Sequence, residues 1–317
     1  MHIGFSAPTA GPLASLDNLA RLCTGAEELG YHYGTFSDHV VIPTAIGSAY
    51  PYSASGEFVT AGTGERNEQL IELAFVAART SALRLVTSVM VVPHRPAVLA
   101  AKQLATIDVL SGGRVTLGIG AGWMKEEFEA LGLPAFEQRG KVTDEYVMAF
   151  RELWTKERPR FSGEYVKFDN ITFAPKPVQK PGIPIWVGGE SGPALRRTAR
   201  YGDAWYPIGN NPAFPMDSLA RLTSGVERLR KLTKDAGRDP QAVGVTMRFP
   251  RYGGDLPAKA GDGARRLFSG KADAIAHDVK ALAALGVGAI DMSFAGATVA
   301  EILAEMKRFK AEVMAKL

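Results

Sequence analysis

The chain has 317 residues, of which 46% are apolar and 22% are charged, and its formal net charge is +4. This composition is typical of a globular enzyme, and no block of basic residues indicates a nucleic-acid partner. The N-terminal stretch MHIGFSAP lacks the features of a signal peptide, and no apolar run reaches the ~18 residues of a membrane span. We therefore expect a cytoplasmic protein without a membrane partner. The single cysteine, Cys23, excludes a disulfide within the chain and a cysteine-rich zinc site.

In the first half of the chain, short runs rich in β-branched residues alternate with amphipathic stretches. The short runs predict strands over residues 3–8, 33–39, 83–92 and 115–122. The amphipathic stretches predict helices over residues 15–29, 68–81, 97–110, 124–131 and 139–155. Gly30 follows the first helix and Pro96 precedes the third, as helix ends and helix starts favour.

Residues 156–183 interrupt this rhythm. Two alternating stretches joined at Asp169 and Asn170, followed by a proline-rich run, predict a β-hairpin insertion. The alternation then resumes, with strands predicted over residues 183–189, 204–208, 242–250 and 289–295. Helices are predicted over residues 192–202, 216–236, 272–285 and from Val299 onward.

The resulting eight strands are each followed by helical sequence and read as continuous apolar runs, as strands buried on both faces do. Eight such units close into an α/β (β/α)₈ TIM barrel. We therefore predict one barrel domain over residues 1–317, with the hairpin insertion between the fourth and fifth strands. The alternative, an open doubly wound sheet, would need a glycine fingerprint after its first strand, which SAPTAGP does not supply.

In such a barrel the catalytic groups come from the C-terminal ends of the strands. Asp38 and His39 follow the second strand, and His39 is predicted to be the only histidine at a strand end. It is a candidate for proton transfer or for a hydrogen bond to a ring carbonyl, although it could equally end the strand by bonding a backbone carbonyl. Asp38 could orient the imidazole, or could instead pair with a lysine or arginine.

Two glycine-rich stretches follow the fourth and fifth strands. GIGAGW, residues 118–123, has Trp123 where a dinucleotide fingerprint requires glycine, so it is not that motif. Its glycines either let a planar ligand approach or allow tight packing. GGESGPALRR, residues 188–197, leads into a helix near Ser191, and its exposed N–H groups predict an anion site.

Residues 40–67 form a long segment without strand or helix patterns, and they leave the same end of the barrel as His39. Unstructured connections are rarely longer than ~12–15 residues. The segment is therefore predicted to be a lid, with Tyr50 and Tyr52 facing the substrate. The alternative is a loose excursion rich in serine, glycine and alanine.

Other chemistries find less support in the sequence. The five histidines are too dispersed to predict a metal site, and no G-x-S-x-G motif occurs. The acidic run KEEFEALG predicts a solvated helix face, although Glu126 or Glu127 could reach the barrel mouth. A mouth poor in catalytic groups but rich in glycine and aromatic residues favours a bound organic cofactor.

Three stretches together resemble the bacterial luciferase-like superfamily, and most closely its coenzyme F420-dependent oxidoreductases. They are SDHVVIP, TSVMVVPHRPAVLAAKQLATIDVLSGGRVTLGIGAGWMKEEFEALG and PIWVGGESGPALRRTARYGDAWYP. The resemblance implies a barrel with an insertion, often dimeric, that holds a flavin or deazaflavin across its mouth. The ring would lie near His39, over a bulge in the third strand with a non-proline cis peptide at Ser88–Val89. The cofactor phosphate would lie at the turns around Gly120–Gly122 and Gly189–Gly192.

One position departs from part of that family. Its sugar-phosphate dehydrogenases carry a glutamate after the glycines of the fourth strand, where this chain has Trp123. A flat apolar side chain there favours a hydrophobic or aromatic substrate.

The predicted site divides into three groups of residues. Catalytic roles are predicted for His39 and Asp38. Cofactor contacts are predicted for Ser88, Val89, Gly120, Gly122, Gly188, Gly189, Glu190, Ser191 and Gly192. Substrate contacts are predicted for Trp123, Tyr50, Tyr52, Trp205, Tyr206 and Arg248.

These features predict an F420-dependent enzyme that transfers a hydride to or from a small organic substrate. The first alternative is an FMN-dependent monooxygenase, supplied with reduced cofactor by a separate reductase. The second is a non-catalytic flavin-binding protein of the same fold. A homodimer is expected in each case.

Overall fold

Each strand of the main sheet pairs in parallel with its neighbours, and the last strand pairs with the first, so the sheet closes into a barrel. In chain order the strands are β1 (His2–Ser6), β2 (Tyr33–Phe36), β3 (Arg84–Thr87), β4 (Met90–Val91), β5 (Val115–Gly120), β8 (Ile185–Gly188), β9 (Ala204–Tyr206), β10 (Gly244–Phe249) and β11 (Val287–Met292). Both β3 and β4 pair with β5, so they are two halves of one strand. The barrel therefore has eight strands within residues 1–58 and 66–317, which this computed structural model describes, and the predicted (β/α)₈ barrel is confirmed.

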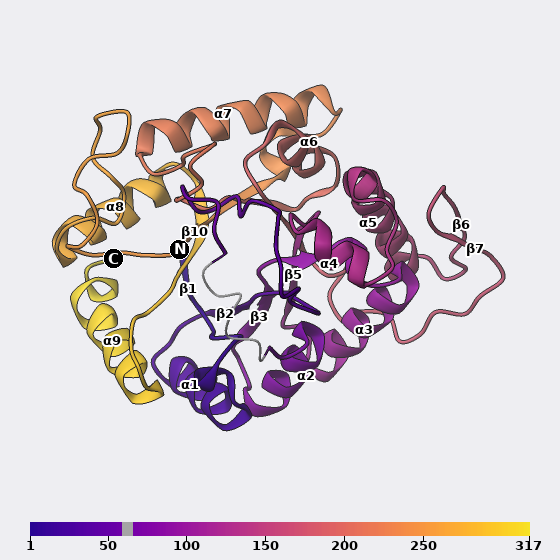
Figure 1. Cartoon of the computed structure of the whole chain (residues 1–317), viewed down its shortest axis with the longest axis horizontal. Coiled ribbons are helices and arrows are strands. Elements are labelled where there is room, and N and C mark those ends of the chain that lie inside the picture. The colour runs from indigo at the N-terminus through magenta and orange to yellow at the C-terminus, as the bar shows by residue number, and fades with distance from the viewer. Residues whose placement is uncertain (59–65) are drawn as a thin grey trace.

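Helices surround the barrel as an outer ring (Figure 1). They are α1 (Leu16–Glu28), α2 (Gln69–Arg79), α3 (Ala97–Leu110), α4 (Lys125–Ala130), α5 (Arg139–Thr155), α6 (Gly192–Tyr201), α7 (Leu219–Asp235), α8 (Ala272–Ala284) and α9 (Val299–Glu312). Short 3₁₀ helices are η1 (Pro12–Ala14), η3 (Val92–His94), η4 (Phe136–Gln138), η5 (Pro240–Ala242) and η6 (Met314–Lys316). In the part of the chain described, no helix has the length and apolar character needed to cross a bilayer.

Side-chain caps decide where several of these helices start. A serine or threonine oxygen accepts a hydrogen bond from the backbone N–H three residues later at Ser15, Ser191, Ser218 and Thr298. Such a cap satisfies one of the N–H groups that a helix start leaves without a partner. For this reason α7 begins at Leu219, three residues later than the sequence predicts.

The insertion between the fourth and fifth barrel strands contains a short antiparallel hairpin. Its strands are β6 (Phe161–Ser162) and β7 (Lys167–Phe168), and the rings of Phe161 and Phe168 stack across it at 5.9 Å. Figure 1 shows the hairpin projecting outside the ring of helices. The predicted insertion is confirmed, although most of residues 156–183 forms neither helix nor strand.

The third barrel strand is interrupted at Ser88 and Val89, which are joined by a cis peptide bond, as the family resemblance implied. The neighbouring strand β5 makes room for this bulge with glycine. A Cβ on Gly118 would lie 2.0 Å from the Thr87 carbonyl oxygen, and one on Gly120 would lie 2.7 Å from the Val89 side chain. Of the two explanations of the glycine-rich run, tight packing therefore holds at these positions.

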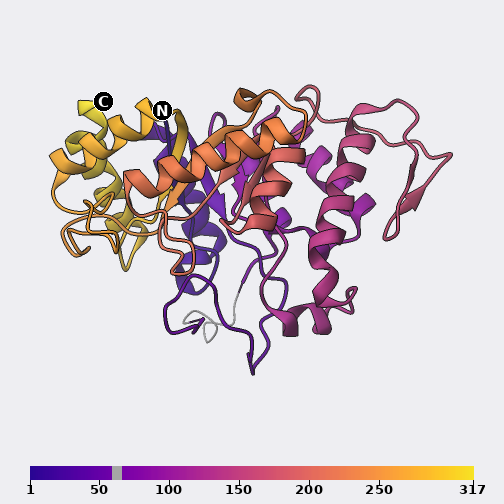
Figure 2. The same cartoon turned by 90° about the horizontal axis from the view of Figure 1, so that it is seen from above.

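The strands place their C-terminal ends at one end of the barrel. Figure 2 shows that the loop after β2 and helix α4 lie at the end opposite to both chain termini. The second strand ends at Phe36, earlier than predicted, so Asp38 and His39 belong to the loop at this mouth. Cys23, on α1, is fully buried, and burial raises the pKa of its thiol.

Candidate active site

Asp38 is held by an arginine rather than by the neighbouring histidine. Its two carboxylate oxygens accept hydrogen bonds from the Arg95 guanidinium, each at 2.8 Å, and one also accepts from the Val91 N–H at 2.9 Å. Arg95 also pairs with Glu68. This bidentate pair ties the loop after β2 to the turn after β4. The prediction that Asp38 orients His39 is therefore wrong, and its alternative, pairing with a basic residue, is correct.

Glu127 on α4 holds His39 instead. Its Oε2 lies 2.9 Å from Nδ1 of His39, and its Oε1 accepts hydrogen bonds from the N–H groups of Val40 at 2.7 Å and Val41 at 3.3 Å. A carboxylate that receives two backbone N–H groups acts as an acceptor, so Nδ1 of His39 carries the hydrogen. The other ring nitrogen, Nε2, is then left as a proton acceptor.

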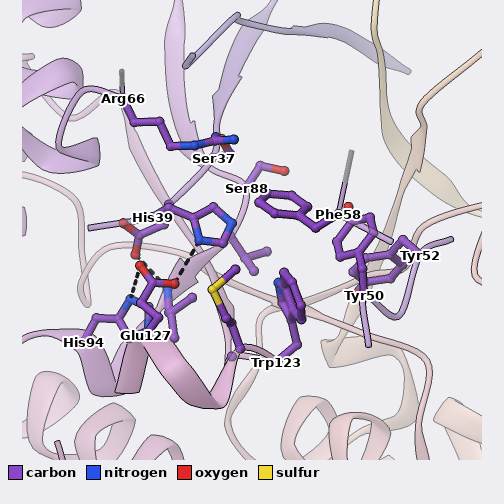
Figure 3. Close-up of a pocket in the computed structure, with 15 residues that line it drawn as sticks. Ser37, His39, Tyr50, Tyr52, Phe58, Arg66, Ser88, His94, Trp123 and Glu127 are labelled. Carbon is purple, nitrogen blue, oxygen red and sulfur yellow. Dashed lines mark hydrogen bonds and ion pairs between the residues drawn. The ribbon is translucent and has the colours of Figure 1, made fainter. Parts of the chain in front are cut away.

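A second histidine lies on the other side of Glu127. His94 ends η3, and its Nδ1 is 3.9 Å from Oε1 of Glu127. Within the described residues neither ring nitrogen of His94 has a hydrogen-bond partner. Its ring packs edge-on against Phe128, and burial lowers the pKa of the imidazole, so that it is neutral near pH 7. Figure 3 shows the Glu127 carboxylate between the two imidazoles.

The neighbouring glutamate of α4 fastens the long loop. One oxygen of Glu126 accepts from the N–H groups of Gly47 at 2.7 Å and Ser48 at 2.9 Å, and the Ser48 hydroxyl accepts from the Lys125 N–H at 3.1 Å. The prediction of a solvated face is thus wrong at Glu126 and Glu127, both of which reach the loop at the mouth. Part of the predicted lid, residues 59–65, lies outside the described residues, and lid closure stays a prediction.

Aromatic rings from this loop and from the end of β5 form the wall of a cavity of about 250 Å³. The ring of Trp123 lies 5.1 Å from that of Tyr50 and 5.3 Å from that of Phe58, and Phe58 lies 5.1 Å from the imidazole of His39. Tyr52 and Ser88 also line the cavity (Figure 3). The structure therefore gathers His39, the two predicted tyrosines and Trp123 around one space.

A second cavity, of about 420 Å³, adjoins the first. Its walls include five residues of the first cavity, namely Tyr52, Val89, Val91, Gly122 and Trp123. Beyond them it is lined by further predicted cofactor residues, namely Gly120, Gly188, Gly189 and Ser191. A ligand with a flat end and a long polar arm would fit two cavities that adjoin in this way.

Two arginines that the sequence did not single out line the second cavity. The Arg139 guanidinium stacks on the Phe136 ring and donates to the Gly122 carbonyl at 3.2 Å. Arg197, one turn into α6, pairs with Asp144. Burial lowers the pKa of Arg139, and the nearby charge of Arg197 lowers it further. Together with the N-terminus of α6, the two guanidiniums favour an anion.

Two predicted cofactor residues lie outside both cavities. Gly192 begins α6 and lines neither space. The Glu190 side chain is buried, and its oxygens accept from the Ile208 N–H at 2.7 Å and the Asn211 amide at 2.5 Å. Burial raises the pKa of this carboxyl to about 7. The prediction that the Glu190 side chain contacts the cofactor is wrong.

Trp205 does not face the substrate. Its indole is fully buried, donates to the Gly189 carbonyl at 2.9 Å and packs against Gly225 of α7. Successive residues of a strand point to opposite faces, so Trp205 points toward the helices while Tyr206 points into the barrel. The predicted substrate contact of Trp205 is therefore wrong.

Tyr206 and Arg248 belong to a polar network inside the barrel. The Tyr206 hydroxyl donates to Asp291 at 2.6 Å and lies 3.0 Å from the Ser88 hydroxyl. Arg248 donates to the other oxygen of Asp291 at 2.6 Å and to the Ser6 hydroxyl at 2.9 Å. Neither Tyr206 nor Arg248 lines the two cavities. Their placement contradicts direct substrate contact and connects them to the cavity through Ser88.

Sequence signals for the missed residues existed. His94 follows the third strand directly, so the prediction that His39 is the only histidine at a strand end is wrong. Glu127 lies seven residues beyond the end of β5, on the short helix that its own acidic run forms. In both cases the rule that catalytic groups follow the strand ends would have indicated the residue, but the neighbouring Asp38–His39 pair and glycine-rich stretches carried more weight in the prediction.

The fold and this site have the character of a (β/α)₈ barrel enzyme with an organic-ligand cavity at its mouth. The chain belongs to the luciferase-like monooxygenase family, whose model matches residues 1–308.

Relatives of the chain differ in what is known about them. An uncharacterised protein of Mycobacterium tuberculosis is 35% identical over 246 residues, which cover 78% of this chain and 79% of that protein. An FMNH₂-dependent dimethylsulfone monooxygenase of Pseudomonas putida is 37% identical over 169 residues, 52% of this chain and 46% of that enzyme. The structure of an F420-dependent secondary alcohol dehydrogenase, in complex with an F420–acetone adduct, superposes with a TM-score of 0.75 at 16% identity, covering 98% of both chains.

Proposed function

We propose that the protein is a coenzyme F420-dependent oxidoreductase that transfers a hydride to or from a small apolar or aromatic substrate. One observation carries the proposal: Glu127 fixes the hydrogen on Nδ1 of His39, leaving Nε2 as a proton acceptor at the wall of an aromatic cavity. Oxidation of an alcohol by hydride transfer also releases the hydroxyl proton, and a positioned imidazole accepts it. Bound F420 would supply the hydride acceptor or donor.

The residues of the two adjoining cavities fit such a cofactor. Ser88 and Val89 line the first cavity together with aromatic side chains that suit a flat ring. In the second cavity Arg139 and Arg197 would hold the phosphate, together with the N–H groups at the start of α6. The glycines at the ends of β5 and β8 carry no side chains, so they leave space for the cofactor in the second cavity.

The wall of the first cavity is largely apolar and aromatic, and besides its two tyrosines its polar side chains are Ser37, Asp38, His39, Arg66, Ser88, His94 and Glu127. Trp123 and Tyr50 present ring faces to it, and Arg66 lies over the Phe58 ring at 5.5 Å. Trp123 occupies the position of the glutamate that sugar-phosphate dehydrogenases of the family use. We therefore propose an apolar or aromatic alcohol or carbonyl compound as substrate.

A second candidate function is that of an FMN-dependent monooxygenase supplied by a separate reductase. Its support is the identity of 37% with the dimethylsulfone monooxygenase of Pseudomonas putida, although this covers only about half of either chain. The same cavities would take FMN, because both cofactors combine a tricyclic ring with a phosphate arm. A reductase partner belongs to this candidate.

Titration of the purified protein with F420 and with FMN, each oxidised and reduced, separates these functions. Cofactor fluorescence and equilibrium dialysis measure the two affinities. Tight binding of F420 with at least ~10-fold weaker binding of FMN supports the proposal, a preference for reduced FMN supports the second candidate, and binding of neither overturns both. Cofactor binding without turnover over a panel of alcohols, aldehydes and ketones would favour the non-catalytic alternative.

We also propose a homodimer, with α2 and α3 at its interface. Both helices expose large apolar side chains, with Ile71 65%, Leu99 51% and Leu110 67% accessible. Large apolar side chains exposed on two neighbouring helices are candidates for an association surface. Light scattering should give twice the mass of the chain, and Leu110→Glu should give the mass of one chain.

A further inference from the structure

His94 is a buried titratable group that the proposed function does not use. Its side chain is 1% exposed, and both ring nitrogens are without a hydrogen-bond partner among the described residues. Buried polar atoms are nearly always paired, and an unpaired one calls for an explanation. His94 also lines the first cavity, next to the carboxylate that holds His39.

Four titratable or charged groups face His94. Glu127 comes from α4, Asp38 and His39 come from the loop after β2, and Arg95 is its neighbour in the chain. Asp38 and Arg95 are bonded to each other in a bidentate pair, so their charges largely cancel. Glu127 therefore remains as the charged partner of the His94 ring.

Glu127 is shared between the two imidazoles through different oxygens. Oε2 lies 2.9 Å from Nδ1 of His39, and Oε1 lies 3.9 Å from Nδ1 of His94. The shorter contact is a hydrogen bond, while the longer one is an ion-pair distance that a side-chain movement can close to the ~2.7–3.0 Å of a hydrogen bond. Arg66 also faces Glu127: burial lowers the pKa of the Arg66 guanidinium, and the negative charge of Glu127 opposes that shift.

We propose that His94 is a second proton-holding residue of this pocket, which exchanges a proton with His39 through the Glu127 carboxylate. The inference rests on the proposed function, in which His39 exchanges a proton with the bound substrate. It adds to that function a residue that holds the proton after it has left His39.

The proton balance is explicit. A ligand hydroxyl gives its proton to Nε2 of His39, and His39 gives its Nδ1 proton to Oε2 of Glu127. The Glu127 carboxyl group then rotates and gives that proton to Nδ1 of His94, which becomes an imidazolium. His39 ends as the neutral tautomer with hydrogen on Nε2, and Glu127 ends as the carboxylate. In the opposite reaction the same steps run backward and deliver a proton to the substrate.

A purely structural role for His94 would leave His39 unaffected by its loss. The proposal instead makes the two imidazoles compete for one carboxylate, so that protonation of one disfavours protonation of the other. Replacing His94 with a side chain that cannot be protonated removes this competition. The pH at which His39 becomes half protonated should then rise.

The experiment follows the histidine ring resonances of the cofactor-free protein by NMR between about pH 5 and pH 9. The chain has only five histidines, so each resonance can be assigned by substitution. His94→Phe keeps the ring contact with Phe128, and His94→Asn provides a smaller polar variant in case the first does not fold. His277→Gln, at an exposed position on α8, is the matched control and should leave His39 unchanged.

We expect the His39 midpoint to rise in both His94 variants, and a ¹⁵N spectrum to place hydrogen on Nδ1 of His39 at neutral pH. Equal His39 midpoints, within ~0.2 pH unit, in the parent protein and a folded variant would overturn the inference. The titration needs no cofactor, so it tests the coupling of the two histidines separately from the proposed function. Coupled histidines in a protein that binds neither F420 nor FMN would overturn the proposed function alone.

Discussion

Two buried carboxylates of the barrel, Glu127 and Asp291, face opposite kinds of partner. Asp291, inside the barrel, receives the Arg248 guanidinium and the Tyr206 hydroxyl, both at 2.6 Å. Glu127, under the loop after β2, accepts hydrogen bonds from the backbone N–H groups of Val40 and Val41 and from one imidazole, and the charge of Arg66 also acts on it. Asp291 is hydrogen-bonded by a permanent cation, whereas the only side chain hydrogen-bonded to Glu127 among the contacts described above is an imidazole.

The difference indicates what each cluster is for. A buried carboxylate that is paired with arginine holds one charge state and one geometry, which suits a network that supports the Ser88 bulge. A buried carboxylate between two imidazoles can exist in several protonation states of similar free energy, which suits proton movement. The two ring nitrogens of His94 have no hydrogen-bond partner among the described residues, which indicates that the cluster around Glu127 is the one suited to proton movement.

Removing the charge of Asp291 should have the largest effect on the stability of the protein. Asp291→Asn keeps the shape of the side chain but leaves the Arg248 guanidinium without its counter-charge inside the barrel. We expect the free energy of unfolding to fall by about 3–5 kcal/mol, because an unpaired buried charge keeps its desolvation cost. Urea unfolding followed by circular dichroism measures it. The control Asp273→Asn, which removes the exposed partner of Lys316, should change stability by less than about 1 kcal/mol.

The opposite cluster should respond in activity rather than in stability. In Glu127→Gln the amide oxygen can still accept from Val40, while the amide N–H₂ group faces Nδ1 of His39. His39 then carries its hydrogen on Nε2 and cannot accept a proton from the substrate. We expect kcat to fall about 10²-fold, equivalent to about 2.7 kcal/mol, with little change in unfolding free energy.

Glu129→Gln is the matched control for this substitution, because Glu129 lies on the same helix and is 64% exposed. Its kcat should equal that of the parent protein. A Glu127→Gln variant with unchanged kcat, or one that unfolds as readily as Asp291→Asn, would show that the two carboxylates have the same structural role.

Glu190 lies between the two cases, since its oxygens are fully hydrogen-bonded but only to neutral donors. Burial raises the pKa of this carboxyl to about 7 in the folded protein, above its ordinary value of 4.5. Its contribution to stability is therefore complete below about pH 4.5 and is lost as the pH rises through about 7.

Replacing Glu190 with glutamine should remove this pH dependence. We expect Glu190→Gln to be more stable than the parent protein by about 1–3 kcal/mol near pH 8.5 and to differ little near pH 5. Thermal unfolding at the two pH values measures the difference. An equal shift at both values would contradict a pKa of about 7 for Glu190, because the carboxyl would then not titrate between them.

Local sequence patterns predicted the order of elements well because each is a short-range property. Apolar runs, helix periodicity and the Gly-Gly-Glu-Ser turn before α6 all act over a few residues, and the barrel follows from repeating them. The start of α7 was predicted three residues early because of a local cap at Ser218, whereas the end of the second strand was misplaced because of a tertiary contact. The second strand ends before Asp38, because that side chain is drawn to Arg95, 57 residues away in the chain.

The candidate site was less accessible, because its partners come from separate strand ends. His39 and Glu127 are 88 residues apart, and nothing near either residue indicates the other. Alternation along β9 could have excluded Trp205 from the mouth, since one of two adjacent aromatic residues must face outward. Arg139 and Arg197 of the second cavity lie on helices. In a sequence, arginines on helices are normally predicted to be on the surface, and only the folded structure shows that these two line a cavity.

The sequence alone determined that the chain forms a (β/α)₈ barrel and that His39 lies at its mouth, because hydrophobic periodicity and the order of strands depend only on residues close together in the chain. Only the tertiary structure decided which carboxylate serves His39. Aspartate was adjacent in the chain, but a guanidinium with two well-placed donors is a stronger partner for it than an imidazole. That pairing left Glu127 to join the two histidines.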